Sequence, residues 1–176
     1  MGRQLLILGA GDYGAVAREI AESTGEYEKI EYADDGAILA ADGREVFGKI
    51  SDLELLAKDF THVAVAIGAP QVRLSLIERA ERIEGLCVAT LISPLAYVSP
   101  SAQIQKGCII EPMAVIHAGV KLGVGCIISA GAVINHVATC CDGVHVDCNA
   151  TVAGRAKVAA NTKVPSGTVY QNSECI

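Results

Sequence analysis

The sequence predicts an α/β N-terminal half-Rossmann-like domain over residues 1–92, followed by a left-handed parallel β-helix of hexapeptide repeats over residues 93–176. Two observations predict this fold. The chain opens with an apolar run, a glycine-rich loop and a helical pattern, which is the order of a nucleotide-binding βα unit. From Val98 to Val164 an apolar residue then returns at every sixth position. Neither a helix nor an alternating sheet has this period, whereas a parallel β-helix does.

The repeat predicts which side chains lie inside the coil. Three hexads close one turn of about eighteen residues, so residues eighteen apart are expected to stack. Branched side chains suit the pleated interior, and smaller residues four positions later suit the corners. The predicted interior set is Val98, Ile104, Ile110, Ile116, Leu122, Ile128, Ile134, Cys140, Val146, Val152, Val158 and Val164.

The N-terminal half alternates predicted strands with predicted helices, which indicates a parallel sheet. A capping box is expected at 51–54, opening a short helix, and a further helix is expected after Pro70. The expected strands are 4–8, 29–33, 62–67 and 87–92.

Glycines and acidic residues follow the first two strands. The loop from Gly9 to Gly14 lets the backbone approach a phosphate, and the helix after it offers free N–H donors. Asp34 and Asp35 end the second strand, where an acidic side chain can accept hydrogen bonds from ribose or base groups. Only one such half is present, so a mononucleotide or nucleotide sugar is favoured over a dinucleotide. A tight turn without a ligand is the alternative.

Composition argues against several classes of protein. The net charge of −6 and the scarcity of aromatic residues argue against a nucleic-acid partner. No apolar run is long enough to span a bilayer, and no signal peptide is recognisable. The seven cysteines contain no C-x-x-C pair, so reduced thiols in a cytoplasmic protein without a metal are expected.

Among the residues of the coil, His136 is the strongest candidate for chemistry. It interrupts an apolar hexad after Asn135, and the stacking rule places Gly154 one coil above it. A glycine there would leave room for a substrate.

Four segments carry a family resemblance: ILGAGDYG, VAIGAPQVR, LISPLAYVSPSA and AGAVINHVATCCDGVHVDCNATVAGRAKV. Together they resemble the sugar acetyltransferases typified by sialic acid O-acetyltransferases and nucleotide-4-amino-sugar N-acetyltransferases of surface polysaccharide biosynthesis. The resemblance implies a homotrimer that binds acetyl-CoA between neighbouring prisms, and direct transfer of the acetyl group to a nucleotide sugar or sialic acid without a metal.

The resemblance also implies site residues by position. His136 stands at the general base, His145 beside acetyl-CoA, Gly154 at the N–H that holds the thioester oxygen, and Ser166 at another CoA contact. An unperturbed histidine has a pKa of about 6.5, which suits a base at neutral pH. The implied substrate-binding residues are Gly11, Asp12, Tyr13, Asp34, Asp35, Gly68 and Arg73.

One departure concerns the base. The family often has Glu or Asp directly after it, whereas this chain has Val137, so Asn135, Asp142, Asp147 or a backbone carbonyl would have to orient the ring.

Two further departures concern the ligands. Asp12 and Tyr13 stand where the family commonly has Gly-His, which affects the preference for a particular nucleotide sugar. The short segment 170–176 predicts a CoA pocket that is shallow or completed by a neighbouring copy. Two other functions remain open: a non-catalytic scaffold of the same fold, and a γ-type carbonic anhydrase with zinc held by histidines between subunits.

Overall fold

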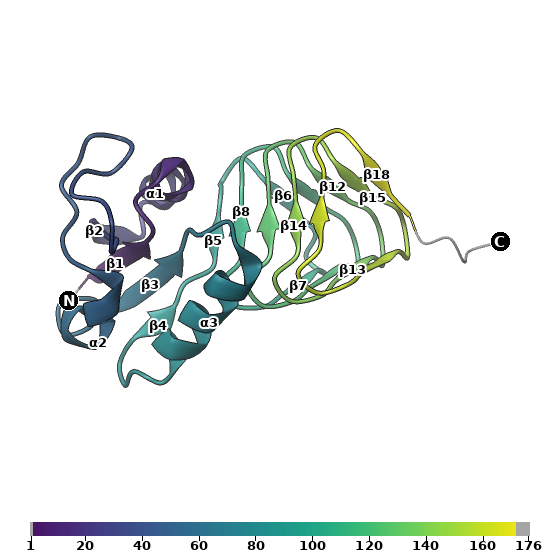
Figure 1. The fold of residues 1–176 in the computed structure, drawn as a ribbon. Helices are drawn as coiled ribbons and strands as arrows, with labels where there is room; N and C mark the ends of the chain where they lie inside the picture. Colours follow the sequence, from purple (N-terminus) through teal and green to yellow (C-terminus); the bar gives the residue numbers. More distant parts are fainter. Residues whose placement is uncertain (1, 172–176) are drawn as a thin grey trace. The chain divides into compact units, whose positions relative to one another are not determined.

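The computed structural model describes residues 2–171. The chain divides into two compact units, Met1–Leu91 and Ile92–Ile176. Figure 1 shows an α/β unit and a coil of short strands. No helix among the described residues has the length and apolar character needed to cross a membrane. Residues 172–176, on which part of the expectation about the C-terminal segment rests, lie outside the described range.

The first unit is a four-stranded parallel sheet with helices packed against it. The strand order is β2-β1-β3-β4. Helix α1 packs against β1 and β2, and α3 packs against β3 and β4. The elements are β1 (Arg3–Leu8), α1 (Asp12–Thr24), β2 (Tyr27–Ala33), a 3₁₀ turn η1 (Ile50–Asp52), α2 (Leu53–Leu56), β3 (His62–Val65), α3 (Pro70–Glu81) and β4 (Cys87–Val88).

Strand β1 lies at the centre of the core of this unit. Leu5, Leu6, Ile7 and Leu8 are all fully buried. A strand of a parallel sheet that is covered on both faces reads as a continuous apolar run, and this run is the one that the sequence shows.

Two local predictions in this unit were wrong. The expected strand at 87–92 is divided: β4 stays in the α/β sheet, whereas β5 (Leu91–Ile92) belongs to a sheet of the coil. The expected capping box does not form, because η1 precedes α2 and no side chain caps it. Glu54 instead accepts a hydrogen bond of 2.8 Å from Arg79 Nε. An apolar run does not reveal which of two sheets each residue joins.

The second unit is the predicted left-handed β-helix. Its two-residue strands form three parallel sheets, in the orders β16-β13-β10-β7, β17-β14-β11-β8-β5 and β18-β15-β12-β9-β6. Their bounds are β6 (Tyr97–Val98), β7 (Gln103–Ile104), β8 (Ile109–Ile110), β9 (Val115–Ile116), β10 (Lys121–Leu122), β11 (Ile127–Ile128), β12 (Val133–Ile134), β13 (Thr139–Cys140), β14 (His145–Val146), β15 (Thr151–Val152), β16 (Lys157–Val158), β17 (Lys163–Val164) and β18 (Val169–Tyr170).

Residues eighteen apart stack, as the period predicts. Val133, for example, is in register with Val115 on one side and Thr151 on the other. The predicted interior positions from Ile110 to Val164 are at most 1% exposed, whereas Val98 and Ile104 at the start of the coil are partly buried. Cysteines also fill this core, and burial, followed by the neighbouring thiols, raises the pKa of Cys140.

The corners of the coil share one backbone feature that the period of the apolar residues does not reveal. A residue with positive φ returns at every sixth position: Gly107, Met113, Gly119, Gly125, Gly131, Val137, Gly143, Asn149, Arg155, Asn161 and Gly167. Glycine and asparagine tolerate this left-handed conformation, whereas it strains other residues. Val137 is the β-branched member of the set, with a φ of 61°.

Candidate functional site

His136 and Gly154 lie against each other at one corner of the coil. His136 follows β12, and the carbonyl of His136 accepts a hydrogen bond from Arg155 N at 3.0 Å, which fixes the next coil above it. A Cβ atom on Gly154 would lie 2.8 Å from His136 Cε1 and 2.9 Å from Nε2. The imidazole therefore packs on the Gly154 backbone in space that any other residue would fill. His136 itself is exposed, so a substrate can reach its ring.

The Gly154 N–H differs from the equivalent group at some corners and resembles it at others. Carboxylates accept hydrogen bonds from three of these groups, Val124 N, Ala130 N and Cys148 N, at 2.8 to 3.0 Å. Within residues 2–171, the Gly154 N–H has no such acceptor, and Ala118 N and Ala160 N also have no acceptor among the described residues. The corner thus presents an unused N–H donor directly beside an imidazole.

The His136 ring is held by Asn135. Asn135 Oδ1 accepts a hydrogen bond from His136 N at 2.8 Å and lies 2.8 Å from His136 Nδ1. The two aspartates that the sequence left as alternatives are engaged elsewhere. Asp142 Oδ1 accepts from Val124 N, and Asp147 accepts from Cys148 N and Lys163 Nζ.

His145 lies on a different face of the coil from His136. It belongs to β14, and its Nε2 lies 3.1 Å from Oγ of the buried Ser129. Close by, Asp147 and Lys163 form an ion pair of 3.0 Å. The hydrogen bond from Lys163 is the main cause that lowers the pKa of Asp147 to about 2, so a carboxylate stays ionised beside His145.

The predicted residues of the coil lie along different edges of the prism. His136 and Gly154 share the edge that separates the β12 sheet from the β13 sheet. Ser166 is exposed and lies on the edge between the β14 sheet and the β15 sheet, stacked above Cys148. A single coil therefore brings His136 and Gly154 together but leaves Ser166 on another edge.

A hollow of about 320 Å³ lies on the sheet β16-β13-β10-β7 and on the edge between this sheet and the β14 sheet. Its lining includes Gln103, Lys121, Cys141 and Asp142. The turn residues in this lining follow the strands and lead to the β14 sheet, so the hollow lies away from the corner that carries His136.

In the α/β unit, the three predicted loops meet at one edge of the sheet. The loops that contain Gly11, Asp34 and Gly68 follow β1, β2 and β3, which are parallel neighbours. Ligands of open parallel sheets bind at this carboxyl edge, where the strand order reverses. Gly11 and Gly68 are both exposed, and a Cβ on either would meet nothing within 4 Å.

The glycine loop is shaped by close packing at its two ends. A Cβ on Gly14 would overlap the carbonyl oxygen of Gly9, so α1 can begin this close to β1 only with a glycine there. Gly9 has a φ of 107°, in the region that favours glycine. Asp12 is exposed and Tyr13 is half-buried in the first turn of α1. Helix α1 therefore directs its N-terminus toward the edge of the sheet.

Asp34 supports the loop rather than standing free. Its Oδ2 accepts a hydrogen bond from Ala10 N at 3.0 Å, and its Oδ1 accepts from Gly36 N and Ala37 N at 2.9 and 3.0 Å. Partial burial acts to raise the pKa of Asp34, but these three donors outweigh it and hold the pKa below its usual value. The neighbouring Asp35 accepts one bond of 2.9 Å, from Ser51 N.

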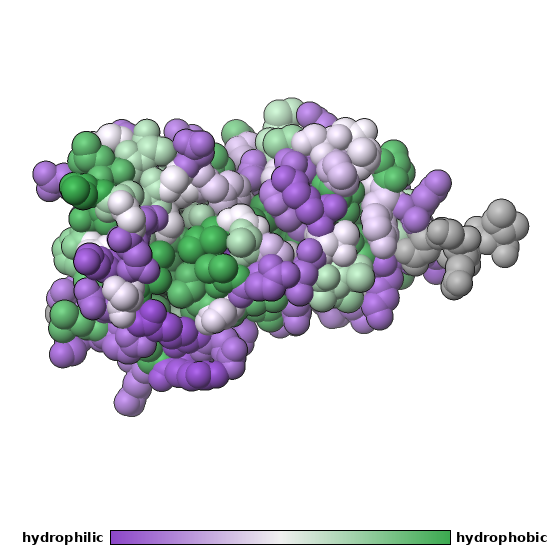
Figure 2. Space-filling model, in the orientation of Figure 1, coloured by the Kyte–Doolittle hydropathy of each residue, from purple (hydrophilic) through white to green (hydrophobic). Residues whose placement is uncertain are grey.

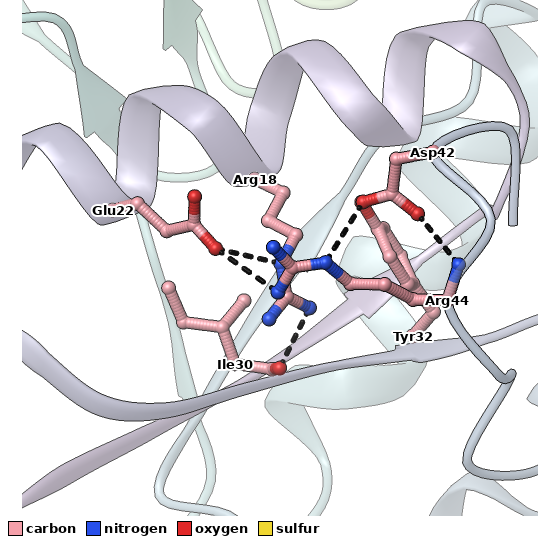
Figure 3. A network of polar contacts seen from close by, with 6 residues as sticks. All are labelled: Arg18, Glu22, Ile30, Tyr32, Asp42 and Arg44. Atoms are coloured by element: carbon pink, nitrogen blue, oxygen red, sulfur yellow. Dashed lines mark hydrogen bonds and ion pairs between the residues drawn. The ribbon is translucent and has the colours of Figure 1, made fainter.

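A polar network fixes the loop between β2 and η1 to α1 (Figure 3). Tyr32 donates to Asp42 Oδ2 at 2.8 Å, and Arg44 reaches both Asp42 and Glu22. Glu22 also accepts from Arg18 Nε at 2.8 Å. Burial, followed by the hydrogen bond to Asp42, raises the pKa of Tyr32, so its hydroxyl remains a donor. No motif in the sequence reveals this network, because its members come from three separate segments.

The loop that this network fixes forms one wall of a pocket of about 250 Å³. Asp34, Asp35 and Lys49 supply its charged lining, and Ile38 on its rim is 84% exposed. Figure 2 shows apolar and polar side chains mixed over the visible surface of this unit. The pocket thus combines charge with an apolar rim.

Arg73 does not reach the surface. It is fully buried, and its guanidinium donates to the carbonyls of Ile67 and Gly68 at 2.7 and 2.9 Å. This placement supports the loop after β3 and does not offer the charge to a phosphate. No group of three metal-ligating side chains is found among the described residues.

Comparison with known proteins identifies the class. Residues 4–80 match the PglD N-terminal domain family. The fold matches the acetyltransferase domain of PglB from Neisseria gonorrhoeae FA1090 with 31% identity and a TM-score of 0.91, covering 97% of this chain and 83% of that one. The same domain in complex with acetyl coenzyme A matches at 30% identity, with the same TM-score and coverage.

A further structure extends the comparison. A mutant form of perosamine N-acetyltransferase from Caulobacter crescentus, in complex with CoA and GDP-perosamine, matches at 26% identity with a TM-score of 0.74. The match covers 95% of this chain and 88% of that one. A search of curated protein sequences gave no match.

The fold and these matches together show that the protein is an acyltransferase. The chain belongs to the left-handed β-helix family of sugar N- and O-acetyltransferases.

Proposed function

We propose that the protein transfers an acetyl group from acetyl-CoA to the amine or hydroxyl of a nucleotide-linked amino sugar or sialic acid, with His136 as general base. The observation that carries the proposal is the contact between the exposed His136 ring and the Gly154 backbone, whose N–H has no acceptor among the described residues. Of the structures named above, one holds acetyl coenzyme A and another holds CoA with GDP-perosamine, which supports the substrate classes.

In this mechanism the two groups at the corner act in one step. His136 takes a proton from the sugar amine or hydroxyl as its nitrogen or oxygen attacks the thioester carbonyl. The Gly154 N–H donates to the oxyanion that forms, a contact worth about 3 kcal/mol in comparable sites. The carbon–sulfur bond then breaks and CoA leaves as a thiolate, which takes up a proton. The protein forms no covalent bond to the acetyl group.

The two units have separate tasks in the proposal. The α/β unit binds the nucleotide sugar at its carboxyl edge, with the N–H groups at the start of α1 and the charge of Lys49 available to phosphates. Gly11, Asp12, Tyr13, Asp35 and Gly68 line this edge as substrate contacts. Asp34 and Arg73 contribute by holding the loops.

The coil contributes the acetyl-transfer site and also requires a second copy of the chain. Ser166 lies on a different edge of the prism from His136, and His145 on a different face. Residues on separate edges can line one acetyl-CoA site when neighbouring prisms pack side by side. The family resemblance implies a homotrimer, and we therefore propose a homotrimer with acetyl-CoA between copies, acting in the cytoplasm, where acetyl-CoA and nucleotide sugars occur.

Thiol release tests the proposal directly. Purified protein is incubated with acetyl-CoA and a panel of UDP-, GDP- and dTDP-linked amino sugars and free sialic acid, and CoA is measured. We expect turnover with at least one acceptor. His136→Ala should lower kcat by roughly 10²- to 10⁴-fold, the usual range for general acid–base catalysis, without weakening acetyl-CoA binding.

His117→Ala is the matched control, because His117 is also an exposed histidine of the coil but stacks below Asn135 rather than on Gly154. This variant should keep its turnover. Full turnover by the His136→Ala variant at every pH would refute the role of the base. Binding of acetyl-CoA without transfer to any acceptor would favour a non-catalytic scaffold.

A further inference from the structure

We infer that Asn135 is the positioning residue that holds neutral His136 as the Nδ1–H tautomer and leaves Nε2 to accept the proton. The inference rests on the proposed role of His136 for its consequence in catalysis, but the tautomer can be measured without turnover. In this chain Asn135, directly before the base, orients the imidazole ring. An acidic residue directly after the base often has this task in the family.

The contacts of Asn135 settle which end of its amide faces the ring. The backbone N–H of His136 can only donate, so the side-chain atom 2.8 Å from it must be the oxygen Oδ1. The same oxygen lies 2.8 Å from His136 Nδ1. An amide oxygen can only accept, so Nδ1 must carry the hydrogen. A flip of the amide would place an NH₂ group against the backbone N–H, which is unfavourable.

The position of the proton decides whether the ring can act as a base. A neutral imidazole has one donor and one acceptor nitrogen, and the hydrogen bond made by one nitrogen fixes the role of the other. In water the Nε2–H tautomer of histidine is the more populated one, which would point a donor at the substrate. The bond to Asn135 reverses this preference, and in serine hydrolases the aspartate of the triad orients its histidine in the same way.

The surroundings leave Asn135 as the group that can do this. The side chain of Val137 carries no acceptor, and it is 49% exposed. Two titratable residues stack at this corner on the adjoining coils: His117 lies below Asn135, and Arg155 follows Gly154. Neither has a hydrogen bond to the ring among the described residues.

The backbone of Asn135 is held as firmly as its side chain. Its N–H donates to Val152 O at 3.0 Å, and its carbonyl accepts from Ala138 N at 3.2 Å. Gly154 contacts the other side of the ring. The imidazole thus lies between a fixed acceptor and a fixed backbone, and little conformational freedom has to be lost before reaction.

The test measures the tautomer in full-length protein labelled with ¹³C,¹⁵N-histidine. The chain has four histidines, and the His136 signals are assigned from their loss in His136→Ala. At a pH where the ring is neutral, we expect a protonated Nδ1 and an unprotonated Nε2. Asn135→Leu, of similar volume but without an acceptor, should shift the population toward Nε2–H. Asn135→Asp keeps both accepted bonds and should retain Nδ1–H.

Kinetics then connects the tautomer to catalysis. Asn135→Leu should lower kcat on the order of tenfold to a hundredfold with little change in KM, below the full contribution of a general base. Asn135→Asp should recover most of the loss. An Nε2–H tautomer in the unmodified protein, or an unchanged tautomer in Asn135→Leu, would overturn the inference even if the enzyme is active. An Nδ1–H tautomer that responds to Asn135 would sustain it even if no acceptor is found.

Discussion

In both turns that carry the candidate residues, a glycine allows close packing beside a polar side chain. The two turns differ in how the hydrogen-bonding groups near that glycine are used. In the α/β unit, Gly14 allows close packing and Asp34 accepts three backbone N–H groups, so the turn satisfies its own polar groups. At the corner of the coil, Gly154 allows close packing, but its N–H and one nitrogen of His136 have no hydrogen-bond partner within residues 2–171. A glycine beside a polar side chain is therefore no evidence of a reactive site until the remaining donors and acceptors are counted.

This difference predicts that the open corner is sensitive to a single methyl group. Gly154→Ala would place a carbon 2.8 Å from the His136 ring, which must then move away from its position. A misplacement of about 1 Å lowers the rate about 10²-fold in well-oriented reactions. We therefore expect kcat to fall by that order. Steady-state kinetics with the identified acceptor measures the effect.

Ala159→Ser is the matched control for this change. Ala159 is an exposed small residue after the next strand of the same coil, so an added atom there meets solvent. It should leave kcat unaffected. If Gly154→Ala retains full kcat, the close contact has no role in the reaction.

The closed turn should instead respond in stability and in binding of the nucleotide sugar. Asp34→Asn replaces Oδ2 with an NH₂ group that faces the donor Ala10 N, so two donors meet and one bond is lost. We expect a loss of about 1 kcal/mol, the net value of a typical hydrogen bond, and a higher KM for the sugar nucleotide. Urea unfolding measures the first effect.

Asp35→Asn separates this effect from a mere loss of charge. Asp35 Oδ1 accepts one bond, which an asparagine oxygen can also accept, so the free energy of unfolding should change less than in Asp34→Asn. Equal losses of unfolding free energy in the two variants would show that the three hydrogen bonds to Asp34 stabilise the fold no more than the one bond to Asp35.

The strained corner at Val137 offers a gain in stability. A β-branched residue in the left-handed region costs about 1 kcal/mol or more, and asparagine already occupies the equivalent positions 149 and 161. Val137→Asn should therefore stabilise the coil by about 1 kcal/mol, measured as a higher Tm. Val169→Asn, which changes an exposed valine on strand β18, should give no gain. A lower Tm for Val137→Asn would show that the valine makes contacts that outweigh its strain.

The smallest expected effect is on the stability of the fold at acidic pH, through the ion pair of Asp147 and Lys163 near His145. The pKa of Asp147 is lowered from 3.8 to about 2 in the folded protein, chiefly by Lys163, so the ion pair stabilises the fold fully above about pH 4. As the pH falls from 3.8 toward 2, this stabilisation is lost. Lys163 is 60% exposed, so its contribution is below about 1 kcal/mol.

Acid unfolding of Asp147→Asn tests this assignment. The variant should be less stable than the unmodified protein at pH 7, and the difference should shrink between pH 4 and pH 2. Lys163→Met should behave in the same way, because it removes the other partner. A difference that does not depend on pH would show that the ion pair is not its cause.

Several features of the site were predictable because they follow from the repeat of the coil or from the parallel order of the strands. The stacking of Gly154 above His136 requires only a period of eighteen, which every coil reinforces. The meeting of the loops after β1, β2 and β3 follows from the parallel order of the strands. The burial of Arg73 and the division between β4 and β5 have no such repetition behind them. Each depends on which side chains and strands happen to be near in space.

The sequence alone determined the architecture, the family and the residues worth testing, because a period of six repeated over the coil leaves one way to bury its apolar side chains. Tertiary structure alone decided what each polar atom does. It directed Asp34 into its own loop, left the Gly154 N–H unused and placed Asn135 Oδ1 against His136 Nδ1. A hydrogen bond depends on angles and distances of a few tenths of an ångström, which no pattern of residue types specifies.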